Sequence, residues 1–116
     1  MITIEDLMSE KEAPVVIADH QGIITHVNDA FAETFEWRAD DVIGKLITTI
    51  IPSPLQDAHH LGFSRFVTTG EPTLLNQPLD LEILTASGRT EKAQHFIVAE
   101  KSDGRWVFGA KIILVY

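Results

Sequence analysis

The last third of the sequence consists of β-rich stretches separated by short turns, and this pattern constrains the fold more than any other feature. The stretches cover residues 74–85, 90–100 and 105–116 and are rich in β-branched, aromatic and other apolar residues. Ala86-Ser87-Gly88-Arg89 and Lys101-Ser102-Asp103-Gly104 separate them, and both segments have the composition of tight turns. The sequence therefore predicts two successive hairpins, which form a three-stranded meander.

Two more strands are predicted near the N-terminus, over residues 14–18 and 23–27, with Asp19-His20-Gln21-Gly22 as the turn between them. The residues between this hairpin and the meander favour helices. Asn28-Asp29 suits a helix start, and Pro54 suits the first turn of a longer helix from Leu55 to about Thr69. We therefore predict an α+β fold: a five-stranded antiparallel sheet with short helices and one longer helix packed on one face.

The first twelve residues predict a separate amphipathic helix, so we divide the chain into a helix at 1–12 and a domain at 13–116. Thr3 precedes Asp6 at the spacing of a capping pair. Ile4, Leu7 and Met8 form an apolar stripe, and a small domain has limited surface to bury it. We therefore expect a homodimer with these three residues at the interface.

Composition excludes several classes of function. The 116 residues include 17 acidic and 9 basic side chains, for a net charge of −8, so nucleic acid is a poor partner. There is no cysteine, which excludes disulfides, thiolate metal sites and a flavin attached through sulfur. No apolar run is long enough to span a bilayer, and the N-terminus is acidic rather than basic. We expect a cytoplasmic protein with no membrane insertion.

Four motifs in order carry a resemblance to a known family. They are Asp19-His20-Gln21-Gly22-Ile23-Ile24, Asn28-Asp29-Ala30-Phe31, Trp37-Arg38-Ala39-Asp40-Asp41-Val42-Ile43-Gly44-Lys45 and Arg65-Phe66-Val67-Thr68-Thr69-Gly70-Glu71-Pro72. In this order and spacing the sequence resembles the PAS (Per-Arnt-Sim) sensory domain over nearly its whole length. Glu36-Trp37 departs from the family, which usually has Gly-Tyr there.

The resemblance implies a sensory or regulatory module without catalysis. Such a module binds a small ligand or cofactor in a cavity between helices and sheet and signals through protein contacts, commonly as a homodimer. Its output would be an effector protein or domain, as in two-component or cyclic-dinucleotide signalling. The sequence shows no Ser-His-Asp order, paired carboxylates on the cavity helix or phosphate-binding glycine loop, so a small cavity enzyme is a remote alternative.

The helix predicted after Pro54 holds the candidate site. On a helical wheel one apolar face contains Leu55, His59, Gly62, Phe63 and Phe66. Only His59 among the polar residues points to that face, beside the gap left by Gly62. An imidazole with apolar walls suits a planar iron-containing ring, but a lone histidine also suits a core position hydrogen-bonded to a carbonyl.

The spacing of His59 before Arg65-Phe66 resembles that of the proximal iron ligand in oxygen-sensing haem PAS domains. Leu79 stands where those proteins carry an arginine that contacts oxygen, which puts the same oxygen chemistry in doubt. The alternatives are therefore a haem-binding gas or redox sensor with His59 as axial ligand and only metal-binding residue, a non-covalent flavin, or another small ligand.

Overall fold

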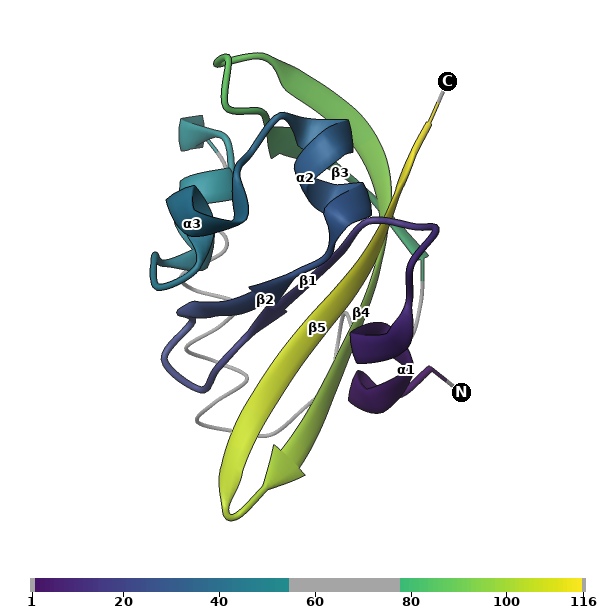
Figure 1. Cartoon of the computed structure of the whole chain (residues 1–116), viewed down its shortest axis with the longest axis vertical. Coiled ribbons are helices and arrows are strands. Elements are labelled where there is room, and N and C mark those ends of the chain that lie inside the picture. The colour runs from purple at the N-terminus through teal and green to yellow at the C-terminus, as the bar shows by residue number, and fades with distance from the viewer. Residues whose placement is uncertain (1, 55–77, 116) are drawn as a thin grey trace.

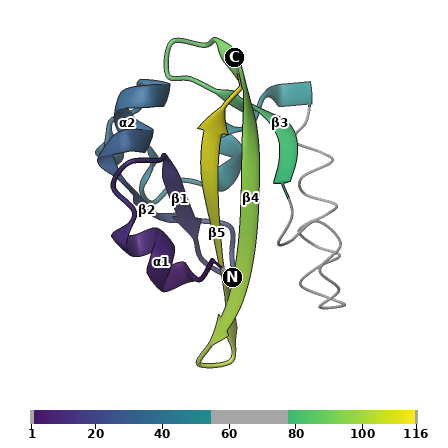
Figure 2. The same cartoon turned by 90° about the vertical axis from the view of Figure 1, so that its right-hand side faces the viewer.

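The computed structural model describes residues 2–54 and 78–115, and this part of the chain forms one five-stranded antiparallel sheet (Figure 1). The strands are β1 (Val15–Ala18), β2 (Ile24–Val27), β3 (Pro78–Leu84), β4 (Thr90–Ser102) and β5 (Arg105–Leu114), in the order β2-β1-β5-β4-β3. The predicted α+β class and the order of strands are confirmed. β4 extends two residues beyond its predicted end, and the long β4–β5 hairpin projects past α1 (Figure 2).

The described helices are short: α1 (Ile4–Ser9), α2 (Asp29–Phe35), α3 (Ala39–Val42) and the 3-10 turn η1 (Ile47–Ile50). Thr3 and Asp6 form the predicted capping box at the start of α1. The Asn28 side chain accepts a hydrogen bond from the Phe31 amide and caps α2. The longest predicted helix, from residue 55 to about 69, lies outside the described residues. Within the described part, no helix has the length and apolar character needed to cross a membrane.

The main core lies between the sheet and helices α2 and α3, on what we call the inner face of the sheet. Phe31 and Phe35 of α2 are fully buried and meet edge to face, with ring centroids 5.3 Å apart. Val42 of α3 is also fully buried in this cluster. The sheet contributes Val16, Ile24, Val27, Ile83, Ala93, Ala110 and Ile112 to it.

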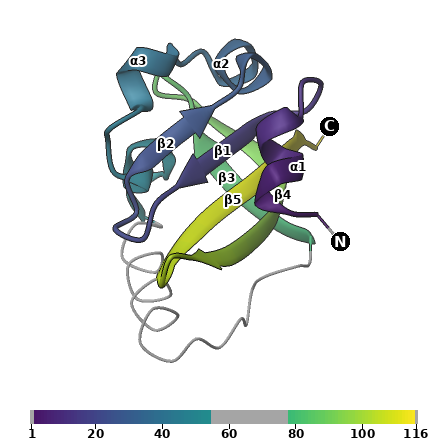
Figure 3. The same cartoon turned by 60° about the horizontal axis from the view of Figure 1, so that its bottom comes forward.

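The opposite, outer face of the sheet carries a second cluster, which α1 covers (Figure 3). Leu7 is 1% exposed and packs with Val15, Ile17 and Val98. Gly109 of β5 makes this seat, because a Cβ on Gly109 would lie 2.6 Å from the Leu7 Cδ1 atom. We predicted helices on one face of the sheet, whereas α1 adds a cover on the other.

This packing corrects the reasoning behind the predicted dimer interface. That reasoning assumed that Ile4, Leu7 and Met8 have too little of their own domain to cover them. Instead, Leu7 is buried against its own sheet and Ile4 is partly buried in the same cluster. Only Met8, which is 52% exposed, remains available to a partner.

Candidate functional site on the inner face of the sheet

Three neighbouring strands place Leu79, His95 and Ile112 in one row across the inner face. Leu79 of β3 pairs with His95 of β4, and His95 pairs in turn with Ile112 of β5. Directly paired residues point to the same side of a sheet, and Ile112 belongs to the inner core. His95 therefore lies on the inner face between two aliphatic neighbours.

The His95 ring is fixed by a hydrogen bond to its own strand. Nδ1 lies 3.1 Å from the Ala93 carbonyl oxygen, and because a carbonyl can only accept, Nδ1 carries the hydrogen. Burial lowers the pKa of His95, against the smaller opposing effect of this hydrogen bond, and so favours the neutral ring. In the neutral ring Nε2 is a hydrogen-bond acceptor, and it makes no hydrogen bond to any residue in 2–54 or 78–115.

Apolar surface continues next to this row. Leu81 lies two residues along β3 and pairs with Ala93, so it shares the inner face. Its side chain is 39% exposed, and Leu79 and His95 are half-buried. The inner side of β3 and β4 therefore combines accessible aliphatic groups with one oriented ring nitrogen.

Contacts between α2 and the β3–β4 turn hold one end of this surface. The Trp37 indole Nε1 donates to the Leu84 carbonyl at 2.9 Å, and the Ala86 amide donates to the Phe35 carbonyl at 3.2 Å. Glu36, in the left-handed region at φ 65°, accepts from Arg89, and this guanidinium is the main cause of its lowered pKa. The departure from Gly-Tyr thus supplies two contacts that join α2 to the sheet.

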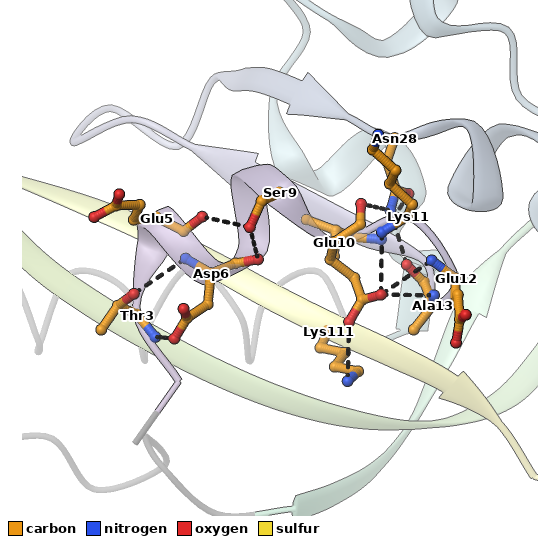
Figure 4. Close-up of polar contacts among 11 residues, drawn as sticks. Thr3, Glu5, Asp6, Ser9, Glu10, Lys11, Glu12, Ala13, Asn28 and Lys111 are labelled. Carbon is orange, nitrogen blue, oxygen red and sulfur yellow. Dashed lines mark hydrogen bonds and ion pairs between the residues drawn. The ribbon is translucent and has the colours of Figure 1, made fainter.

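A polar cluster around Glu10 fixes the linker between α1 and β1 (Figure 4). Its carboxylate accepts hydrogen bonds from the amides of Lys11, Glu12 and Ala13 and pairs with Lys111 of β5 at 3.1 Å. The amide hydrogen bonds, that of Glu12 foremost, together with Lys111 lower the Glu10 pKa to about 2.

Asn28 ties the same linker to the core. Its Nδ2 donates to the carbonyls of Glu10 and Ala13, and its Oδ1 accepts from the amides of Val15 and Phe31. A groove of about 390 Å³ lies alongside, lined by Glu10, Glu12, Ala13, Pro14, Thr34, Lys111, Ile113 and Leu114. Because Glu10 and Lys111 already pair with each other, we assign this region to anchoring rather than to ligand binding.

Most of the site predicted from sequence lies outside the described residues: Leu55, His59, Gly62, Phe63 and Phe66. The haem and flavin alternatives therefore stay predictions. Leu79 lies on the inner face, next to His95. The sequence analysis missed His95, although Ala93, His95 and Ile97 alternate along one predicted strand and could have indicated a histidine on an apolar face.

Comparison with known proteins identifies the fold family. The sequence profile of the PAS fold matches residues 5–73, which is more than half of the chain. An uncharacterized protein from Azorhizobium caulinodans is 34% identical over 97 residues. The match covers 83% of this chain but only 13% of that relative.

Solved structures agree with this match. A PAS domain from Desulfitobacterium hafniense has a TM-score of 0.74 at 15% identity, covering 93% of this chain and 97% of that one. The PAS domain of a two-component sensor histidine kinase has a TM-score of 0.72 at 13% identity, covering 94% and 90%. The PAS domain of the Cronobacter turicensis RpfR quorum-sensing receptor, in complex with BDSF, has a TM-score of 0.64 at 18% identity, covering 89% and 95%. Its sequence and its sheet thus agree, and the chain belongs to the PAS fold family.

Proposed function

We propose that this PAS domain is a sensory module that binds a small, largely apolar ligand on the inner face of the sheet and signals through protein contacts. The observation that carries the proposal is the row Leu79, His95 and Ile112, with the exposed Leu81 beside it. Aliphatic side chains around a few oriented polar groups are the usual lining of a small-molecule site. Neither neighbour of His95 in the row is an acid or a nucleophile, which favours binding over catalysis.

Similar proteins support a signalling role. One PAS domain of this fold comes from a sensor histidine kinase, and another was solved in complex with BDSF. The chain spans 13% of the length of its relative from Azorhizobium caulinodans. By analogy, we expect an effector protein or domain to read the state of this module.

The location of binding is tested by titrating the whole chain with 4-methylphenol and following assigned methyl signals by NMR. We expect saturable shifts at Leu79, Leu81 and Ile112. Val15 and Val107, in the outer cluster, serve as controls and should not move. No saturable shift, or shifts confined to the outer cluster, would contradict the proposal. An absorbance spectrum of the purified protein tests the haem and flavin alternatives.

Homodimerisation through the outer side is the second part of the proposal. Met8 on α1 and Ile113 of β5 are 52% and 48% exposed, and exposed apolar side chains on one side of a small domain favour self-association. We expect Met8→Glu to convert a dimer into a monomer in light scattering, because the charge would lie in the contact. Glu5→Gln, an exposed change on the same helix, is the control. An unchanged mass for Met8→Glu would remove α1 from the interface.

A further inference from the structure

The His95 ring combines two features that restrict which ligands the inner face accepts. First, the bond from Nδ1 to the Ala93 carbonyl determines the tautomer, so that Nε2 carries the free lone pair. Second, Nε2 is the ring nitrogen farther from the backbone, and the neighbours across the sheet, Leu79 and Ile112, offer it no hydrogen.

We propose, resting on the ligand-binding function above, that His95 Nε2 selects small apolar molecules that carry one neutral hydrogen-bond donor, a hydroxyl or an N–H. The donor binds Nε2, and the apolar body lies against Leu79, Leu81 and Ile112. A ligand without a donor leaves the lone pair unpaired in a partly desolvated place, which is unfavourable.

The same geometry disfavours anionic ligands. An ionised carboxylate has no hydrogen to donate to Nε2, and binding it through this atom would require a protonated ring beside aliphatic neighbours. The net charge of −8 also opposes the approach of an anion. Selection by His95 therefore separates a phenol from a carboxylate of similar size.

The test compares three probes that share a methylbenzene body: 4-methylphenol, its isostere p-xylene, and 4-methylbenzoate. Dissociation constants are measured by NMR titration for the wild type and for His95→Leu. We expect the preference of the wild type for 4-methylphenol over p-xylene to fall about tenfold in His95→Leu, the loss of one hydrogen bond. We expect 4-methylbenzoate to bind the wild type more weakly than 4-methylphenol.

His26→Leu is the matched control, because His26 pairs with Ile17 and lies half-buried on the outer face. It should keep the wild-type preference. His95→Gln, which retains an acceptor oxygen, should retain part of it. A readout that needs no variant is the ¹⁵N signal of Nε2 in the wild type, which should shift with 4-methylphenol and not with p-xylene.

The possible failures are distinguishable. If both uncharged probes bind the inner face and His95→Leu leaves their ratio unchanged, the selection by His95 is wrong and the proposed function stands. An unmoved Nε2 signal in the presence of bound 4-methylphenol leads to the same conclusion. If neither probe gives saturable shifts at Leu79, Leu81 or Ile112, both proposals are wrong.

Discussion

The two faces of the sheet are covered in different ways. On the inner face, fully buried Phe31, Phe35 and Val42 come from two helices and pack against all five strands or their neighbours in one large cluster. On the outer face a single six-residue helix contributes one fully buried side chain, Leu7, to a smaller cluster. The comparison shows that the inner cover maintains the fold, whereas the outer cover is an attached element whose seat and anchors can be changed separately.

The polar anchors follow the same division. On the outer side the Ile4 amide donates to Glu100 at 2.8 Å, and Glu10 pairs with Lys111, so both ends of α1 are tied to the sheet. On the inner side Asn28 bonds to the linker, β1 and α2 together. The outer anchors thus fix one helix, while Asn28 joins several elements.

The largest effect is expected from Phe31→Ala, which should lower the free energy of unfolding by about 3–5 kcal/mol, because it leaves a large cavity in the inner cluster. Leu7→Ala should cost less, about 2 kcal/mol, since α1 can detach while the inner cluster remains. Urea denaturation measures both. Equal losses for the two variants would contradict the division between a main and an attached cover. Met8→Ala, at an exposed position of α1, should change stability by less than about 0.5 kcal/mol.

The second effect concerns the seat of α1. Gly109→Val should lower stability by about 2 kcal/mol, because its side chain would occupy the space of Leu7 Cδ1 and of Ile4 Cδ1, which lie 2.6 and 3.0 Å from the Cβ position. Hydrogen exchange should show that the amides of α1 lose protection while those of β4 keep theirs. The penalty should be smaller in a Leu7→Ala background, and additive losses in that double-mutant cycle would show that Leu7 does not occupy the seat.

Local signals in the sequence account for most of the predicted fold. The turns at Gly88 and Gly104 have φ of 90° and 77°, which glycine adopts without strain, so their positions could be read directly from the chain. The capping pair Thr3 and Asp6 was equally local. The face that α1 covers was not predictable, because its seat depends on Gly109, about one hundred residues away in sequence.

The candidate site was predictable only in part, for the same reason. Leu79 was identified through a family resemblance and does lie on the inner face. The place of His95 depends on the register of β4 against both β3 and β5, which pairs it with Leu79 and Ile112. Alternation along one strand gives two faces but does not say which one meets the core. The structure, rather than the pattern, therefore assigned His95 to the inner side.

A smaller effect is expected at the linker. Glu10→Gln should lower stability by about 1 kcal/mol at neutral pH, because the amide keeps one acceptor oxygen and loses the charge that attracts Lys111 and the backbone amides. The folded pKa of about 2 lies below the ordinary 4.5, so this contribution is complete above pH 4.5 and is lost as the pH falls toward 2. Thermal melts of the two proteins should therefore converge in acid. A constant difference between pH 7 and pH 2 would show that charge at Glu10 is not the cause.

The smallest effect is expected on the inner face, from the titration of His95. Burial lowers its folded pKa below the ordinary 6.5, so as the pH falls below 6.5 the unfolded chain takes up a proton before the folded protein does. Wild-type stability should therefore decrease from pH 6.5 downward and level off once the folded ring is also protonated. His95→Leu should lack this component, whereas His26→Leu should retain it. Because the Glu10 contribution changes only below pH 4.5, melts at pH values above that point separate the two faces: a His95→Leu protein that follows the wild-type pH dependence there would show that His95 is not desolvated on the inner face.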